Sequence, residues 1–359
     1  MKAVVFEKVG APLRVTDVPA PVPGTGEVVV DVFASRVLSY AGDIFSGRRD
    51  YPFALPAVPG TGAIGRIRAV GNDATRLQPG DWVFCDPTIR ARDDAVAPDV
   101  MLQGLIAPGS GARRLQAWVG NGSWAEQLLL PTENVTRLGE VQEASAAQWC
   151  ALSTLAVPFG GLLAAEFQAG DTLLLHGATG SFGSAGVAVA IAMGARCVVA
   201  AGRNEKALDD LVRRFGDRVR PVALRGNPEA DQAAMRAAAP CPIDCVLDIM
   251  PPAASVAAVR AAAMTVRPQG RIVLMGGVGG QAGEELALPY AWLMRNDVTV
   301  RGKWMYPRDA LARLAAMVRA GLIDIGQFAT TAFPLERVDD AVAHAASDAG
   351  PFRMTLLQP

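Results

Sequence analysis

Beyond residue 143, short apolar runs alternate with alanine-rich stretches of helical character. The runs cover residues 172–176, 197–201, 244–248, 271–275 and 298–302. Continuous apolar runs are typical of strands buried on both faces, and their alternation with helices predicts a parallel sheet. After this series we expect a helix over residues 309–319 and a last strand over residues 353–357.

The first 136 residues follow a different pattern, with short alternating strands such as 27–32 and 65–71 separated by proline and glycine. This pattern predicts a mainly β domain. Within it, residues 86–116 form a long polar insertion without a clear period, and insertions of this length are often functional or mobile loops. A chain of 359 residues exceeds the usual size of one hydrophobic core, so we expect two domains.

Composition and charge point to a small-molecule partner. With 34 basic and 35 acidic residues and no block of like charge, the chain lacks the charge pattern of a nucleic-acid binder. No apolar run reaches the roughly 18–20 residues that span a bilayer, so no membrane insertion is expected. Five widely spaced cysteines predict reduced thiols and a cytoplasmic location rather than a disulfide framework. A metal site at Cys241 and Cys245 is disfavoured because a second ligand pair is missing.

Residues 173–186 read Leu-Leu-Leu-His-Gly-Ala-Thr-Gly-Ser-Phe-Gly-Ser-Ala-Gly, a strand followed by a glycine turn and a helix. This is the context of a dinucleotide-binding fingerprint, although Ala178 stands at the first motif glycine. Helix-start amides offer an anion site there, and glycines allow close approach of a pyrophosphate. The alternative is a plain strand–helix turn. The expected cofactor contacts in this loop are Gly177, Thr179, Gly180, Ser181, Phe182 and Gly183.

The end of the following strand indicates which dinucleotide binds. Sites for NAD usually carry an acidic residue there for the ribose 2′-hydroxyl, whereas this chain has Gly202 and Arg203. An arginine pairs well with a 2′-phosphate, so NADP(H) is favoured, with Asn204 and Lys206 as further contacts. The alternative is that Arg203 is an ordinary solvated residue.

Motifs spread over nearly the whole chain occur in an order and spacing that resemble the medium-chain dehydrogenase/reductase superfamily, which includes zinc alcohol dehydrogenases, quinone reductases and enoyl reductases. These motifs are the strand at 1–6, Pro-Gly-Thr-Gly-Glu-Val at 23–28, Val-Pro-Gly at 58–60, Ala-Val-Gly at 69–71, Pro-Gly-Asp-Trp-Val at 79–83, Gly-Ser-Trp-Ala-Glu at 122–126 and the nucleotide loop.

The resemblance implies an α/β fold with a GroES-like β domain and a Rossmann domain of doubly wound parallel sheet. The GroES-like catalytic domain is expected over residues 1–136, the NADP-binding Rossmann domain over 137–303, and a return to the catalytic domain over 304–359. By resemblance, the active site lies in the cleft between the domains. The strand at 298–302 often pairs across a dimer axis in this family, so a homodimer is expected, with Trp304 and Tyr306 lining either the pocket or the interface.

The family's catalytic zinc ligands are largely missing. Zinc members carry a cysteine where this chain has Tyr40, and Gly-His-Glu where it has Gly60-Thr61-Gly62; only Cys150 of that set remains. A catalytic zinc needs about three protein ligands, so the expectation is that no metal binds here. The only histidines are His176 and His344, and the insertion at 86–116, in the place of the family's structural-zinc lobe, has no cysteine.

Without a Lewis acid, an acceptor activated by conjugation becomes the better substrate. We therefore expect an NADPH-dependent reductase that transfers hydride to an activated double bond or quinone, with an apolar or conjugated small-molecule substrate. One alternative is a zinc-independent carbonyl or imine reductase resembling alcohol dehydrogenases. A second alternative is a catalytically silent nucleotide-binding protein.

Candidate catalytic groups are Tyr40, Tyr51 and Ser39, which could bond the acceptor oxygen or deliver a proton. By resemblance, Tyr51 lies where quinone and enoyl reductases often carry a cleft tyrosine. The alternative for each tyrosine is packing in an aromatic-lined pocket. Asp43 is expected to be structural, as a helix N-cap or a supporting group, and His176 to be positional rather than a base. By resemblance, Thr154 lies near the nicotinamide and phosphates, Met250 near the adenosine half, and Gly276, Gly277 and Val278 beside the carboxamide.

Overall fold

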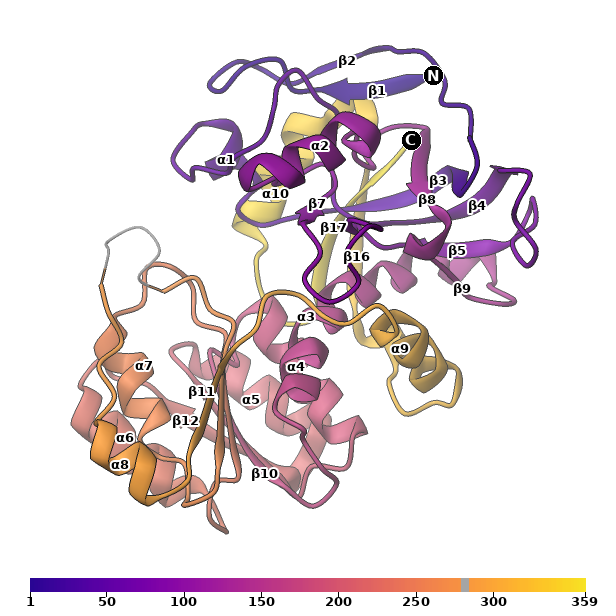
Figure 1. The fold of residues 1–359 in the computed structure, drawn as a ribbon. Helices are drawn as coiled ribbons and strands as arrows, with labels where there is room; N and C mark the ends of the chain where they lie inside the picture. Colours follow the sequence, from indigo (N-terminus) through magenta and orange to yellow (C-terminus); the bar gives the residue numbers. More distant parts are fainter. Residues whose placement is uncertain (279–283) are drawn as a thin grey trace. The chain divides into compact units, whose positions relative to one another are not determined.

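The computed structural model describes residues 1–278 and 284–359, which form two compact units (Figure 1). Unit 1 contains Met1–Ser153, Ile325–Ala349 and Arg353–Pro359, and unit 2 contains Thr154–Asp324 and Gly350–Phe352. The chain first passes from one unit to the other inside helix α3 (Ala151–Ala164), beyond the division expected at residue 136. It returns after helix α9 (Ala310–Arg319), beyond the division expected at residue 303.

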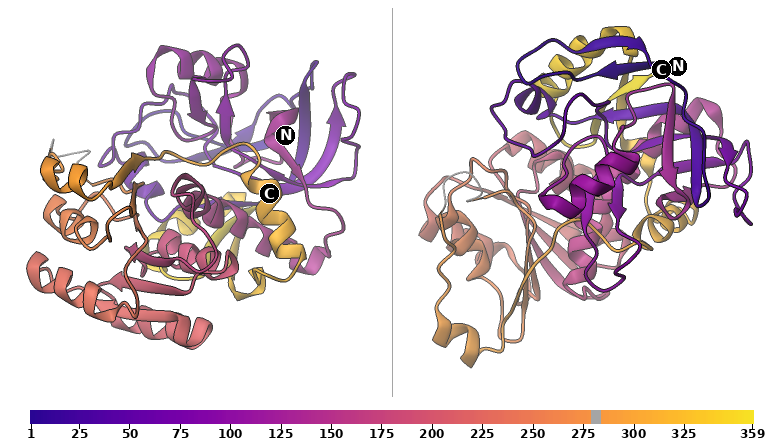
Figure 2. Two further views of the ribbon diagram at one scale, coloured as in Figure 1. Left: turned by 60° about the horizontal axis from the view of Figure 1, so that its bottom comes forward. Right: turned by 45° about the horizontal axis from the view of Figure 1, so that its top comes forward.

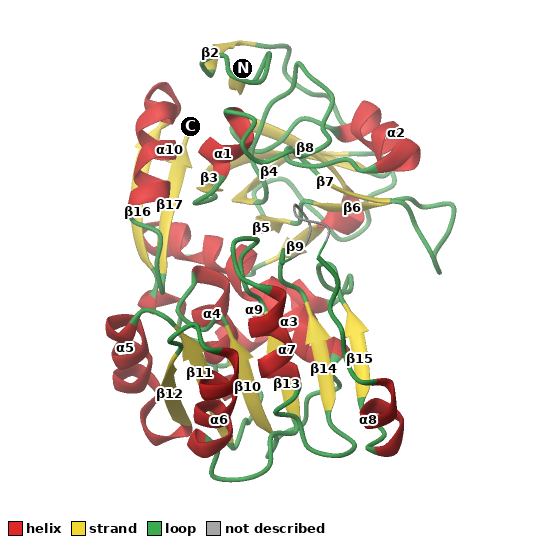
Figure 3. Cartoon of the chain, turned by 90° about the vertical axis from the view of Figure 1, so that its left-hand side faces the viewer, coloured by secondary structure: helices red, strands yellow, loops and turns green. Residues whose placement is uncertain are grey.

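Unit 2 is built on a parallel six-stranded sheet in the order β12-β11-β10-β13-β14-β15 (Figure 3). The doubly wound parallel fold expected from the apolar runs is confirmed, because each run forms a strand within a residue of its expected bounds. The strands are β10 (Thr172–His176), β11 (Cys197–Gly202), β12 (Val219–Ala223), β13 (Cys245–Asp248), β14 (Arg271–Leu274) and β15 (Thr299–Gly302).

Helices cover both faces of this sheet, which explains why its central strands β10, β11 and β13 are buried at every position and mainly apolar. On one face, Leu174 and Val246 pack with Met235 and Ala262 of two crossover helices. On the other face, α3 and α4 lie so close to the strands that glycines are needed at the contact. A side chain at Gly186 would overlap Leu175. The remaining helices of unit 2 are α4 (Ser181–Ala192), α5 (Glu205–Phe215), α6 (Pro228–Ala238), α7 (Val256–Ala263) and α8 (Tyr290–Arg295).

Unit 1 is mainly β, as its alternating pattern predicts. Its largest sheet runs β16-β17-β3-β4-β5-β9, with β8 also paired to β3, and both chain ends lie close together in this unit (Figure 2). The strands of unit 1 are β1 (Lys2–Val5), β2 (Arg14–Asp17), β3 (Glu27–Val37), β4 (Ala63–Val70), β5 (Trp82–Cys85), β6 (Thr88–Arg90), β7 (Val100–Leu102), β8 (Gln127–Pro131), β9 (Val135–Arg137), β16 (Ala329–Pro334) and β17 (Arg353–Gln358). Its helices are α1 (Ala41–Phe45), α2 (Gly109–Val119) and α10 (Val338–Ser347).

The insertion at 86–116 is not the long irregular loop that its composition suggests. It contains the hairpin β6–β7 and most of α2, and it encloses a small core of its own around Ile89, Met101 and Ala112. The helix begins Gly-Ser-Gly, residues of weak helix propensity, which is why the pattern does not reveal it. The correction matters because α2 contacts the segment that forms one wall of the pocket described below.

One apolar segment, Glu143–Ala164, is long enough and hydrophobic enough to be compared with a membrane span. Of its most apolar window, 72% is buried inside the fold. The segment therefore has the burial of a core helix.

Candidate functional site

The loops that follow the strands of unit 2 meet at one edge of its sheet, because parallel strands share their carboxyl ends. The chain order reverses between β10 and β13, and open α/β sheets bind ligands at such a switch point. His176 and Asp248 are paired residues at this point, and the imidazole Nδ1 lies 2.7 Å from the carboxylate Oδ1. Both side chains are buried, so this edge is fixed by an internal polar contact.

The turn after β10 has the glycine geometry of a phosphate-binding loop. Gly177 has φ +98°, and a Cβ at Gly183 would lie 2.0 Å from the Gly177 carbonyl oxygen. These two glycines are therefore required by the turn and by helix packing. A Cβ at Gly180 would meet only that same oxygen, at 3.6 Å. The protein itself leaves room for a side chain at Gly180, so glycine there fits the approach of a ligand.

The start of α4 offers an anion-binding end. Gly180 is the N-cap and provides no side-chain acceptor, and Ser181 and Phe182 occupy the first turn. Helix N-termini carry unsatisfied amides and a partial positive charge, so an uncapped start beside a glycine turn suits a phosphate group.

The end of β11 is shaped by contact with the glycine turn. A Cβ at Gly202 would lie 2.4 Å from Cγ2 of Thr179, so no side chain fits there without moving the threonine. Arg203 and Lys206 are exposed at this edge. Asn204 has a local role, because its Oδ1 accepts a hydrogen bond from the Ala207 amide as the N-cap of α5.

The loops that follow β13 and β14 also contain residues expected to contact the cofactor. Met250 is buried after β13, and its carbonyl oxygen accepts a hydrogen bond from the Gly277 amide. A Cβ at Gly276 would lie 2.7 Å from Asp248 Oδ2, so this turn packs tightly on β13. Val278 follows as the last described residue before the segment 279–283, which lies outside the described residues.

Thr154 is a fully buried residue of α3 whose hydroxyl has no hydrogen-bond partner among the described residues. Buried hydroxyls usually have a partner, often the carbonyl one turn back in a helix. An unpartnered Oγ1 at this position fits a hydrogen bond to the expected cofactor.

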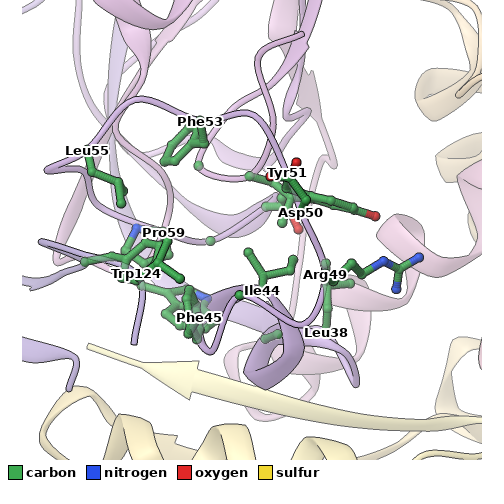
Figure 4. A pocket seen from close by; sticks show the side chains of 18 of the residues that line it. Leu38, Ile44, Phe45, Arg49, Asp50, Tyr51, Phe53, Leu55, Pro59 and Trp124 are labelled. Atoms are coloured by element: carbon green, nitrogen blue, oxygen red, sulfur yellow. The ribbon is translucent and has the colours of Figure 1, made fainter. Parts of the chain in front are cut away.

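Unit 1 contains a mainly apolar cavity of about 220 Å³. Figure 4 shows aromatic and aliphatic side chains on one side and the ends of Arg49 and Tyr51 on the other. The residues that line it include Phe6, Arg36, Leu38, Phe45, Arg49, Asp50, Tyr51, Phe53, Leu55, Pro59, Thr61 and Trp124. Such a cavity suits a small apolar molecule with one polar end.

The predicted catalytic residues occupy different positions around this cavity. Tyr51 lines it, whereas Tyr40 lies behind Tyr51 with ring centroids 6.2 Å apart in an edge-to-face contact. The Arg49 guanidinium lies 4.0 Å from the Tyr40 ring centroid and 5.2 Å from that of Tyr51. Burial, together with the neighbouring Tyr51, raises the pKa of Tyr40 above its ordinary value, so its phenol stays protonated. Ser39 is exposed in the turn between β3 and α1 and does not line the cavity.

The residues at the family's zinc positions have other local roles. Burial raises the pKa of the Cys150 thiol to about 12, and the thiol contacts the Ala34 carbonyl oxygen at 3.6 Å. Gly62 has φ +73°, and its carbonyl accepts hydrogen bonds from the buried hydroxyls of Ser35 and Ser123. Within residues 1–278 and 284–359, no three His, Cys, Asp or Glu side chains cluster as a metal site would require.

Asp43 differs from its expected place as a helix N-cap. Tyr40 is the N-cap residue of α1, and Asp43 lies inside the helix, where its carboxylate pairs with Arg48 at 2.7 Å. The helix begins one turn earlier than the expectation assumed.

Two protein-family models together match most of the chain. The alcohol dehydrogenase GroES-like domain matches residues 24–140, and the zinc-binding dehydrogenase domain matches residues 182–320. The chain belongs to the medium-chain dehydrogenase/reductase superfamily. The GroES-like and Rossmann domains expected from the resemblance are thereby confirmed.

Curated relatives of this medium-chain dehydrogenase/reductase include both alcohol dehydrogenases and quinone oxidoreductases. An alcohol dehydrogenase of Moraxella sp. (strain TAE123) is 29% identical over 54% of this chain and 56% of its own length. A quinone oxidoreductase of Homo sapiens is 27% identical over 57% of this chain and 54% of its own length. The matched region thus spans about half the length of these relatives.

Solved structures agree with the fold over the whole chain. A putative zinc-binding dehydrogenase from Sinorhizobium meliloti 1021 bound to NADP has a TM-score of 0.79 at 20% identity, covering 100% of this chain and 99% of that one. A short chain alcohol dehydrogenase from E. coli CFT073 complexed with NADH has a TM-score of 0.78 at 20% identity, with the same coverage.

Sequence reasoning missed several residues of this medium-chain dehydrogenase/reductase. Arg36 and Arg49 both line the cavity, and no motif singles them out. Asp248 was noted only as a strand end, yet it holds His176. The arginine-rich Gly-Arg-Arg-Asp-Tyr at 47–51 is the one signal in the sequence that could have led to Arg49.

Proposed function

We propose that this chain is an NADPH-dependent reductase of activated double bonds or quinones, working without zinc. Unit 2 holds the cofactor and unit 1 supplies the acceptor pocket. The observation that carries the proposal is the donor set at the family's metal positions. Tyr40, Thr61 and Gly62 offer a phenol, a hydroxyl and a backbone group there, and Cys150, which stands at the fourth of these positions, is a buried thiol whose pKa is raised. A catalytic zinc is bound by thiolate, imidazole and carboxylate groups.

Residues of unit 2 fit a nicotinamide dinucleotide. The glycine turn and the α4 start would hold the pyrophosphate, Arg203 the 2′-phosphate, and Thr154 the nicotinamide end through its buried hydroxyl. Both NADH and NADP occur in solved structures of the same fold. The proposal of NADPH rather than NADH as the cofactor therefore rests on Gly202 and Arg203. When bound, NADPH supplies a hydride, two electrons with a hydrogen nucleus, to the acceptor.

Reduction of a conjugated double bond also needs one proton, delivered to the carbon next to the one that gains hydride. Tyr51 lines the cavity and is the candidate to orient the acceptor or pass this proton. The protonated phenol of Tyr40 lies beside Tyr51 and would help to stabilise negative charge on the acceptor oxygen. Charge stabilisation by phenol hydrogen bonds replaces the role of a metal in this scheme.

A second candidate function is reduction of a carbonyl or imine without zinc. It is supported by the similarity to an alcohol dehydrogenase, which is as high as the similarity to a quinone oxidoreductase. In that reaction hydride goes to the carbonyl or imine carbon and the proton to oxygen or nitrogen.

The test is NADPH consumption with a panel of quinones, enones, enoyl thioesters, aldehydes and cyclic imines. The proposal expects turnover with conjugated acceptors and little with simple aldehydes. Turnover confined to aldehydes or imines would favour the second candidate. Cofactor binding without turnover on any acceptor would favour a silent nucleotide-binding protein.

We also propose that the enzyme is a cytoplasmic homodimer formed through β15. This strand is the edge of the unit 2 sheet, and all four of its residues are exposed. Exposed apolar side chains gather on β15 and nearby segments at Tyr290, Met294, Val300 and Trp304, while Tyr306 is buried. An unpaired apolar edge favours pairing with a second copy. Light scattering should give a dimer that Val300→Lys dissociates and that Val22→Lys, at an exposed site of unit 1, leaves intact.

A further inference from the structure

The cavity of unit 1 has a charged end that an ordinary enone or quinone does not need. Two arginines, Arg36 and Arg49, line it against a single carboxylate, Asp50. Figure 4 shows that Arg49 and Tyr51 end on the same side, away from Phe45, Phe53 and Leu55. The lining of the cavity thus holds two cations and one carboxylate, and Arg49 marks its polar end.

Arg49 is held in place without being neutralised. Its guanidinium packs over the Tyr40 and Tyr51 rings, which fixes its plane. In the described ranges 1–278 and 284–359, no carboxylate forms an ion pair with Arg49, and this includes its exposed neighbour Asp50. The adjacent Arg48 behaves differently, because it pairs with Asp43 at 2.7 Å and does not line the cavity.

Arg36 adds a second cation in a more buried position. Its side chain comes from the end of β3 and is only 6% exposed. Burial lowers the pKa of Arg36 to about 10, so it remains charged at neutral pH. Its charge therefore adds to that of Arg49 in the wall of the cavity.

We propose that the acceptor of this site carries a carboxylate, bound by Arg49 at the polar end of the cavity, and that the rest of the molecule is a single ring or a short aliphatic chain. This inference rests on the proposed reductase function for the identity of the site. Guanidinium groups bind carboxylates through paired, charge-assisted hydrogen bonds. The cavity volume of about 220 Å³ lies below the roughly 300–1,000 Å³ of sites for drug-sized ligands. This volume limits the acceptor to a single ring or a short chain besides its carboxylate.

The acceptor class that combines these features is an unsaturated oxo acid such as 4-oxo-4-phenyl-2-butenoate. Its double bond is activated by the ketone. Hydride from NADPH would add to the carbon next to the carboxylate, and a proton to the carbon next to the ketone. The products are 4-oxo-4-phenylbutanoate and NADP⁺, so electrons and protons balance.

The test separates binding from turnover. The full chain saturated with NADP⁺ is titrated calorimetrically with 4-phenylbutyrate and with 4-phenylbutyramide, neither of which accepts hydride. We expect the acid to bind about tenfold or more tightly than the amide, the usual gain from hydrogen bonds to a charged group. Arg49→Gln should abolish this preference, and Arg48→Gln, beside it in the sequence, should keep it.

Equal affinities for acid and amide would overturn the proposal, and so would an equal loss of preference in both variants. If Arg49→Gln folds poorly, Arg49→Lys replaces it in the test. The lysine keeps the charge but loses the paired geometry, so it should retain only part of the preference for the acid. NADPH oxidation by 4-oxo-4-phenyl-2-butenoate is then measured separately. A preserved preference for the acid without oxidation of NADPH would contradict the reductase function while supporting the carboxylate site.

Discussion

His176 Nδ1 and Asp248 Oδ1 lie 2.7 Å apart at the ends of two adjacent parallel strands, and both side chains are buried. The pair joins β10 to β13 where the chain order of the sheet reverses. Nε2 of His176 has no hydrogen-bond partner among the described residues. The aspartate thus fixes the ring at the base of the glycine turn, a positional role rather than that of an exposed base.

Removing one partner of this contact should destabilise unit 2. Asp248→Ala leaves a buried imidazole nitrogen unsatisfied, so we expect a loss of roughly 1–3 kcal/mol in the free energy of unfolding. Urea denaturation followed by circular dichroism measures it, with the exposed Asp217→Ala as a control. Similar midpoints for Asp248→Ala and the wild type would show that the contact adds no net stability.

The contact between Gly202 and Thr179 predicts that cofactor preference cannot be reversed by one substitution. Gly202→Asp places a Cβ 2.4 Å from Cγ2 of the threonine, so we expect loss of NADPH binding without gain of NADH binding. Adding Thr179→Gly removes the clash and should let the new carboxylate bind the NADH ribose. Dissociation constants from fluorescence titration measure both. Tight NADH binding by Gly202→Asp alone would contradict this reasoning.

Gln116 of α2 holds the pocket wall through two backbone hydrogen bonds. Its Oε1 accepts from the Ala54 amide at 2.9 Å, and its Nε2 donates to the Ala54 carbonyl at 2.8 Å. Gln116→Ala should cost roughly 1–3 kcal/mol of stability and raise KM more than it lowers kcat, because the wall carrying Phe53 and Leu55 loosens. Arg114→Ala, exposed on the same helix, is the control. An unchanged KM would assign Gln116 a purely structural role.

Burial of Cys150 predicts instability at alkaline pH. The thiol has an ordinary pKa of 9.0, and burial raises its pKa to about 12 in the folded chain. The unfolded chain therefore loses this proton first, so the stabilisation is complete below pH 9 and falls as the pH rises toward 12. The loss is up to about 1.4 kcal/mol per pH unit.

The check is the free energy of unfolding between pH 8 and 10.5 for the wild type and for Cys150→Ser. The variant should show a shallower fall, with some slope left because the pKa of Cys245 is also raised to about 12 by burial. Cys241→Ser, at a half-exposed position, should match the wild type. A Cys150→Ser slope equal to that of the wild type would contradict the assignment.

Local signals predicted the unit 2 fold well. Five of its six strands come from the short runs recognised in the sequence, and the glycine turn is contiguous, so periodicity and a motif are sufficient for them. The edge strand β12 was not predicted, because the exposed Arg220 and Pro221 interrupt its apolar pattern. The close contact of Gly202 with Thr179 was not predictable, because it joins two loops that meet only when β10 and β11 pair.

The unit 1 pocket was harder to predict for the same physical reason. Its walls come from segments far apart in the chain, such as Phe6, Arg36, Tyr51 and Trp124. Tyr51 was named from the resemblance, whereas the arginines carry no periodicity or motif that separates them from surface residues. The helix α2 was missed because its stability comes from packing of Ala112 and Val119 rather than from its weak local propensity.

The central claim is that hydride passes from NADPH to a conjugated carbon. The most direct measurement uses NADPH deuterated at the transferred position of C4, a conjugated enone or oxo-enoic acid, and mass spectrometry of the product. The account predicts one deuterium on the former double-bond carbon that is not attached to the ketone. One NADP⁺ should form per molecule of product. Deuterium on the carbonyl carbon, with the double bond intact, would contradict it.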